Sequence, residues 1–209
     1  MEFKSAFTEY YNCSAPATDV YCMVTHHIFP NHEVCGSHIV KHTTQGVTMP
    51  LYGLFMLDID SPRNGFLALK SIEEAFDKKE VCFLCDPTSQ TLNMKVLNPI
   101  LMNKKLRPKD PLCTRLFANV DGAVLRLPAG VFPFRRCLSM HAKLSFSMAL
   151  SFKWIVSSDH LDTYFTLSES VWKSRSDWGI SPNCNQESCC SDIDYEFANN
   201  FTLYWKFYA

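Results

Sequence analysis

The feature that most constrains the fold is a run of alternating residues late in the chain. From Leu138 to Val156 every even position is apolar, while most odd positions hold serine, lysine or histidine. A period of two places successive side chains on opposite faces of an extended strand. At about 3.3 Å per residue this run exceeds an ordinary strand, so it is expected to bend or to follow the wall of a barrel.

A second alternating run favours the same fold class. Residues 157–160 supply turn chemistry, and residues 161–168 alternate again, which predicts a long, curved antiparallel hairpin. Apolar residues recur at helical spacing only between Phe66 and Lys79. Further strands are expected at 20–29, 51–59, 81–85 and 120–127. The predicted fold is therefore mainly β, an OB-like antiparallel barrel or sandwich with one or two short helices.

Length and composition favour one domain with a polar tail. The 209 residues are 47% hydrophobic and 13% aromatic, which suits a globular core of ordinary depth. A β-rich domain is expected over 1–173, a polar, acidic loop or tail over 174–199, and an aromatic strand over 200–209. That last strand is apolar enough to suggest self-association.

The sequence also bears on the compartment. The first residues carry acids and lack the apolar run of a signal peptide, and no stretch of about 18 apolar residues occurs. We therefore expect an intracellular protein, in the nucleus or cytoplasm, that is not secreted and has no membrane partner. Ten cysteines are then expected to be buried residues, thiols or metal ligands rather than disulfides.

The near-neutral net charge of −1 conceals a segregation along the chain. Residues 1–94 hold 6 basic and 11 acidic side chains, residues 95–154 hold 11 and 2, and residues 155–209 hold 3 and 8. The middle segment has the electrostatic character of a surface that binds a polyanion. A solvated basic face that pairs with the acidic ends is the alternative. The candidate nucleic-acid-binding residues are Lys104, Lys105, Arg107, Lys109, Arg126, Arg135, Arg136, Lys143, Lys153, Tyr164 and Trp172.

Histidine and cysteine are concentrated in two short segments. Five of the seven histidines lie between His26 and His42, interleaved with cysteine, and a Cys-x-x-Cys pair follows at 82–85. Imidazole and thiolate are the ligands that zinc prefers. The spacing predicts a structural zinc site made by Cys35, His38, Cys82 and Cys85. Surface histidines and buried cysteines are the alternative interpretation.

Little in the sequence points to catalysis. The seven glycines fit no phosphate-binding loop, and no serine or cysteine nucleophile motif occurs. Asp58 and Asp60 lie on one face of an expected strand end, as in some metal-dependent phosphoryl-transfer sites. Without a further carboxylate nearby, a solvated strand end explains them, so the chain is expected not to be an enzyme.

The basic segment, the aromatic residues and the acidic tail together favour a protein that binds single-stranded nucleic acid in a β-sheet groove. In layout the chain resembles the single-stranded DNA-binding proteins of large DNA viruses and phages, which pair an oligonucleotide-binding barrel with an acidic tail. The resemblance implies a viral protein acting inside a host cell, with zinc as a structural ion in some members. The alternative is a structural or assembly β-sandwich protein, such as a viral structural component.

Overall fold

A computed structural model describes residues 3–15, 19–86 and 88–156. Strands in this part of the chain form three antiparallel pairs and no larger sheet. The pairs are β1 (Asp19–Cys22) with β2 (His27–Pro30), β3 (Val34–His38) with β4 (Gly65–Leu69), and β5 (Val81–Cys85) with β6 (Leu92–Val96).

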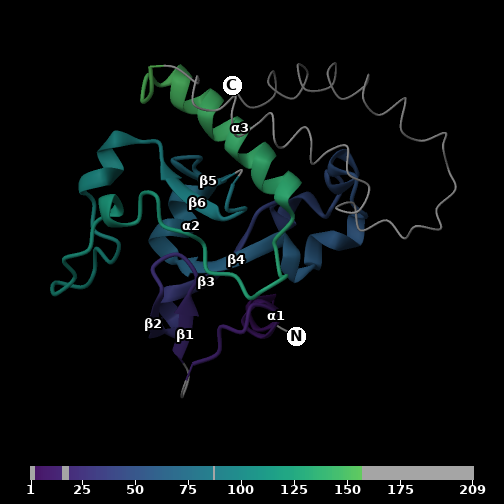
Figure 1. Cartoon of the computed structure of the whole chain (residues 1–209), viewed down its shortest axis with the longest axis horizontal. Helices are drawn as coiled ribbons and strands as arrows, with labels where there is room; N and C mark the ends of the chain where they lie inside the picture. Colours follow the sequence, from purple (N-terminus) through teal and green to yellow (C-terminus); the bar gives the residue numbers. More distant parts are fainter. Residues whose placement is uncertain (1–2, 16–18, 87, 157–209) are drawn as a thin grey trace, which may run out of the picture.

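Helices and short 3-10 turns connect and cover these pairs (Figure 1). The α-helices are α1 (Phe3–Tyr10), α2 (Lys70–Asp77) and α3 (Arg135–Ser151). The 3-10 turns are η1 (Asn31–Glu33), η2 (His42–Thr44), η3 (Met49–Tyr52), η4 (Met56–Asp60), η5 (Pro62–Asn64), η6 (Pro99–Asn103) and η7 (Phe117–Asn119).

Strand β4 is the centre of the core, since all five of its residues are buried. Helix α1 packs on the β3–β4 pair through Phe7, which is fully buried. Two glycines make room for this ring. A Cβ atom at Gly36 would lie 2.6 Å from Phe7 Cδ2, and one at Gly65 would collide with the same ring and with the Ser37 carbonyl. The close approach of α1 therefore depends on glycine at both positions.

The predicted long hairpin is wrong, because residues 135–151 form helix α3. Every fourth residue of a period-two pattern also lies on one face of a helix, so Leu138, Ala142 and Phe146 fit both structures. The burial of other positions in the run distinguishes a helix from a strand. His141 and Ser145, polar odd positions, are buried, whereas Phe152 is 60% exposed.

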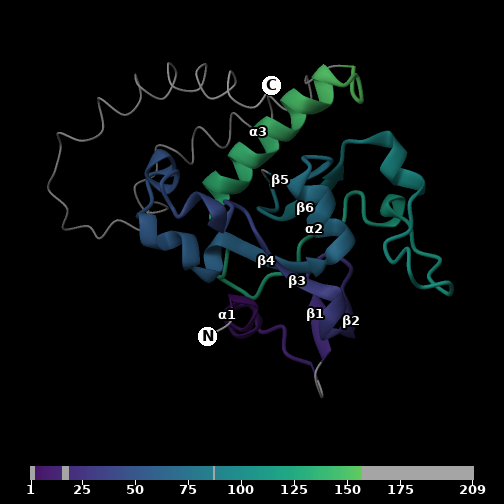
Figure 2. The ribbon, with the colours of Figure 1, turned by 180° about the vertical axis from the view of Figure 1, so that it is seen from behind.

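Composition explains why the helix forms. From 134 to 154 the chain has no glycine, proline, valine, isoleucine or threonine and is rich in leucine, methionine, alanine and lysine. Helix α3 then lies against the β5–β6 pair, mainly on β5 (Figures 1 and 2). Its residues Ala142, Phe146 and Ala149 pack with Cys82 and Leu97.

The fold class is corrected accordingly. Two-stranded pairs with strands of four or five residues cannot close a barrel or stack as a sandwich, so the described chain is neither. Residues 51–59 form 3-10 turns instead of a strand, and 120–127 contribute only an isolated bridge between Val124 and Asn93. The segment 20–29 contains a hairpin, and the strand at 81–85 is confirmed. The helix expected between Phe66 and Lys79 begins at Lys70, after β4.

Several expectations lie outside the described residues. These are the returning strand at 161–168, the boundary after residue 173, the acidic segment and the terminal aromatic strand, together with Tyr164 and Trp172. Within the described ranges, none of the helices combines the length and apolarity that crossing a membrane requires. The seven described cysteines carry free thiols.

Candidate active site around His38

The candidate active site lies where β3, β4 and α2 meet. The antiparallel register places His38, the last residue of β3, opposite Gly65, the first residue of β4. Helix α2 follows β4 directly, and its buried residues Ile72, Ala75 and Phe76 pack it back onto the core. His38 therefore lies at the end of the β3–β4 pair, close to helix α2.

Asn64 fixes the backbone beside His38. Its buried side-chain carbonyl accepts a hydrogen bond from Val40 N at 3.0 Å, and its amide donates to the carbonyls of Val40 and Ile59, each at 2.9 Å. The Asn64 main-chain carbonyl also accepts from Ile39 N at 2.9 Å. Because the side chain bonds on both sides of the loop after β3, it holds His38 in place.

His38 is a half-buried imidazole without a hydrogen-bond partner at Nε2 among the described residues. Its ring stacks on Phe3 of α1, with centroids 3.4 Å apart and planes 2° from parallel. Burial lowers the pKa of His38 to about 4, and His42 acts in the same direction, whereas Asp60 and Asp77 oppose the shift. The imidazole is therefore neutral at pH 7 and able to accept a proton.

Carboxylates surround this histidine. Asp77 pairs with Lys41 at 2.8 Å, and Asp60 lies 3.2 Å from Nε2 of His42. Glu73 faces Cys35 from α2, and its pKa is raised by burial first and by Asp77 next. The surroundings of His38 thus contain several carboxylates and are partly shielded from solvent.

The four predicted zinc ligands do not come together in the structure. Cys35 and His38 lie on β3, whereas Cys82 and Cys85 lie on β5. Cys82 is fully buried beside α3, and burial raises its pKa far above the ordinary thiol value. In the described ranges, no three His, Cys, Asp or Glu side chains are close enough to hold a metal ion.

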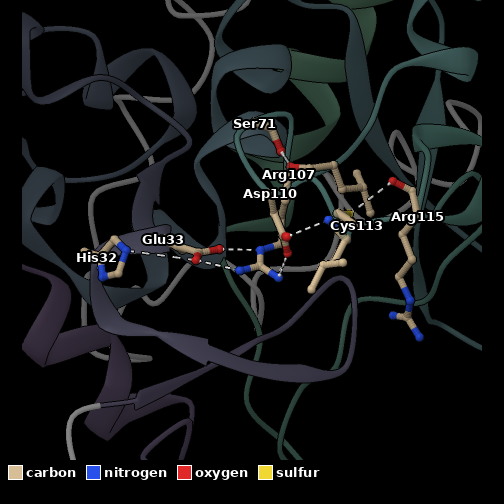
Figure 3. A network of polar contacts seen from close by, with 9 residues as sticks. His32, Glu33, Ser71, Arg107, Asp110, Cys113 and Arg115 are labelled. Carbon is tan, nitrogen blue, oxygen red and sulfur yellow. Dashed lines mark hydrogen bonds and ion pairs between the residues drawn. The ribbon is translucent and has the colours of Figure 1, made fainter.

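Arg107, one of the predicted nucleic-acid-binding residues, forms ion pairs within the protein. The Arg107 guanidinium makes a bidentate ion pair with Glu33, with Nε at 2.6 Å and Nη2 at 2.7 Å, and its Nη1 lies 2.6 Å from Asp110 (Figure 3). Hydrogen bonding to Arg107 holds the pKa of Glu33 below its usual value. This pairing ties η1 to the segment after η6 and leaves Arg107 little charge to offer a phosphate.

The other predicted basic residues lie on separate segments. Lys104, Lys105 and Lys109 are exposed between η6 and η7, and Arg126 stacks over Tyr21 with 4.1 Å to the ring centroid. Arg135 and Arg136 begin helix α3, Lys143 lies within it, and Lys153 follows its end. A helix of 17 residues is about 25 Å long, so the two ends of α3 are well apart. These residues therefore do not line one continuous β-sheet groove.

Residues 22–84, from Cys22 in β1 to Leu84 in β5, match the HNH endonuclease family. The matched segment contains the whole β3–β4–α2 unit, with His38, Asn64 and Glu73. Neither the curated proteins nor the solved structures provide a match to this chain.

This match corrects two expectations. Because the matched family is one of endonucleases, the prediction that the chain is not an enzyme is wrong. The expectation of nucleic-acid binding agrees with the match, whereas neither the match nor the fold supports an oligonucleotide-binding barrel or a viral β-sandwich.

HNH nucleases often bind a metal ion. His38 Nε2 is one nitrogen that lacks a partner, yet the part of the chain that the structure describes brings no second and third ligand to it. The described side chains do not by themselves make a metal site.

The sequence predicts His38 as a zinc ligand, from its spacing to Cys35, and not as a general base. It does not predict the roles of Asn64 and Phe3, because these depend on contacts between distant parts of the chain. The Asn64-Gly65 pair, at the start of a buried apolar run, was the available signal.

Proposed function

We propose that the chain hydrolyses phosphodiester bonds of nucleic acid, with His38 as the general base. The observation that carries this proposal is a neutral imidazole with an unpartnered Nε2, within the segment that matches the HNH endonuclease family. General bases in hydrolysis are most often histidines that accept a proton from the attacking water.

In the proposed step, His38 Nε2 takes a proton from water while the water oxygen forms a bond to phosphorus. The bond from phosphorus to the leaving strand oxygen breaks, and that oxygen takes a proton from solvent. An imidazole whose pKa is about 4 is a weak base, but an approaching phosphate adds negative charge that stabilises the protonated ring. Substrate binding therefore raises the basicity of His38 when it is needed.

Reaction at His38 requires water to reach a buried nitrogen. Nε2 is buried, and Phe3 covers one face of the ring. Water can therefore reach Nε2 only when the packing around this nitrogen opens locally.

The test is cleavage of labelled single-stranded and duplex oligonucleotides by the full chain, each with and without a chelator. His38→Ala is compared with His32→Ala, because the His32 side chain is 80% exposed and lies outside the site. We expect cleavage by the natural chain and by His32→Ala, and its loss in His38→Ala. Equal cleavage by His38→Ala would refute the role of this residue.

A further inference from the structure

A second feature that the HNH match does not explain is a basic pocket at the start of α3. The pocket has a volume of about 330 Å³ and is lined by three arginines, Arg63, Arg135 and Arg136, and three aromatic residues, Tyr10, Phe132 and Phe134. None of the described lining residues is a carboxylate. The volume falls within the range of small-molecule sites rather than that of a bare ion.

The aromatic rings hold two of the guanidinium groups. The Arg63 guanidinium carbon lies 4.7 Å from the centroid of Phe134, and that of Arg135 lies 4.2 Å from the centroid of Phe132. Stacking leaves the in-plane N–H donors of an arginine available to an anion. The planar groups are therefore preorganised for bidentate contact with phosphate.

The hydrogen-bond partners of these two arginines are neutral. Arg63 Nε donates to the Phe132 carbonyl at 3.2 Å, and Arg135 Nη1 donates to Gln90 Oε1 at 2.9 Å. Among the described residues neither makes an ion pair, in contrast to Arg107, which has two carboxylate partners. No carboxylate of the described residues therefore lies within ion-pair distance of either guanidinium group.

Their position on the helix adds to this charge. Arg135 and Arg136 open α3, where the helix dipole already favours an anion, and the first turn contains no acidic residue. The cap residue Phe134 offers no side-chain hydrogen bond to the free N–H groups of that turn. A bound anion would offset the repulsion between the helix end and its own arginines.

The pocket and His38 lie at opposite ends of α1. Phe3, which stacks on His38, and Tyr10, which lines the pocket, are seven residues apart in the same helix. Seven residues correspond to about 10 Å of helix rise. A strand seated in the pocket can therefore reach His38 within a few nucleotides.

We propose that this pocket binds a backbone phosphate of the nucleic acid strand on which His38 acts, with its arginines on the phosphate and its aromatic rings beside the attached nucleoside. The inference rests on the proposed function for its substrate. Aromatic stacking of bases beside arginines is a recurrent way to hold a strand without reading its sequence.

The test measures the affinity of the full chain for a labelled oligonucleotide at two salt concentrations. Arg135→Gln is compared with Arg115→Gln, which removes the same charge from an exposed arginine that does not line the pocket. We expect Arg135→Gln to weaken binding about tenfold and to reduce the slope of log affinity on log salt by about 0.7 to 0.9. Arg115→Gln should change affinity less than twofold. Arg135→Lys, which keeps the charge but loses the planar stack, should lie between them.

Other outcomes separate the two proposals. Equal effects of Arg135→Gln and Arg115→Gln would overturn the pocket and leave cleavage by His38 untouched. Arg135-dependent binding without any cleavage would support the pocket and refute the proposed hydrolysis. If a nucleoside monophosphate binds in an Arg135-dependent way while oligonucleotide affinity does not depend on Arg135, the pocket serves a free nucleotide and the inference is wrong.

Discussion

The His38 site and the pocket at the start of α3 differ in charge although both contact α1. Asp60, Asp77 and Glu73 lie around the first, whereas the second is lined by three arginines. A neutral base needs a partly dry site, and the carboxylates near it repel a phosphate. Attraction of the strand must then come from elsewhere. Contacts remote from the reacting bond can supply that binding energy and orient the bond.

The largest expected effect is on the chemical step. His38→Ala should lower the rate of cleavage about 10²- to 10⁴-fold, the usual contribution of a general base. Affinity for the oligonucleotide should stay within twofold, because the strand is held at the pocket. Measured binding and single-turnover cleavage check both. A matching loss of affinity would mean that the two regions are not separate.

The next effect is on stability. Phe7→Ala should lower the free energy of unfolding by about 3–5 kcal/mol, since a fully buried ring leaves a cavity between α1 and the β3–β4 pair. Denaturant unfolding measures the change. Phe152→Ala, at an exposed ring beyond α3, is the matched control and should cost well under 1 kcal/mol.

A smaller effect concerns pH. With a pKa of about 4, His38 of the free chain is neutral above that value, so kcat/KM for cleavage by the natural chain should fall only as the pH drops through about 4. Phe3→Ala exposes the ring and should move this fall towards the ordinary histidine pKa of about 6.5. A pH–rate profile that does not move would show that Phe3 has no part in keeping the ring neutral.

The same shift affects folding. Between about pH 6.5 and 4 the unfolded chain binds a proton at His38 that the folded chain does not, so stability should decrease as the pH falls through this window. Phe3→Ala should flatten the contribution of His38 to that decrease. Unfolding measured at several pH values checks the sign.

The smallest effect is expected at the paired arginine. Arg107→Gln should lower stability by no more than about 1 kcal/mol, because the pair with Glu33 is partly exposed. Oligonucleotide affinity should change less than twofold, since two carboxylates already occupy the guanidinium. A loss of oligonucleotide affinity as large as that of Arg135→Gln would show that ion pairing with carboxylates does not keep an arginine from binding the strand.

Sequence reasoning identified some elements for sound physical reasons. Residues 81–85 form a strand as expected, because a short apolar run with valine and phenylalanine suits a buried strand. The helix predicted between Phe66 and Lys79 is confirmed over Lys70–Asp77, whereas Phe66 and Leu69 belong to strand β4. The run from Leu138 failed because i, i+4 and i+8 belong to both periods, and the absence of β-branched residues was the evidence to weigh against alternation.

The candidate site was only partly within reach of the sequence. The cluster of histidines at residues 26–42 predicted a structural zinc site, because spacing along the chain does not distinguish a metal ligand from a general base. The distinction depends on Phe3 and Asn64, which are 35 and 26 residues away from His38 in the sequence and meet it only in the fold. In the same way, Arg63 joins Arg135 because the Phe134 amide donates to the Arg63 carbonyl at 2.7 Å.

The packing of Phe7 against Gly36 and Gly65 determines how short a fragment of this protein can be and still fold. The segment recognised by sequence similarity begins at Cys22, after α1. A fragment cut to that boundary would keep both glycines but lose the ring that fills the space between them, and it would leave one face of His38 bare. The segment that matches the family is thus shorter than the segment needed for stable folding. A fragment intended to fold should include α1.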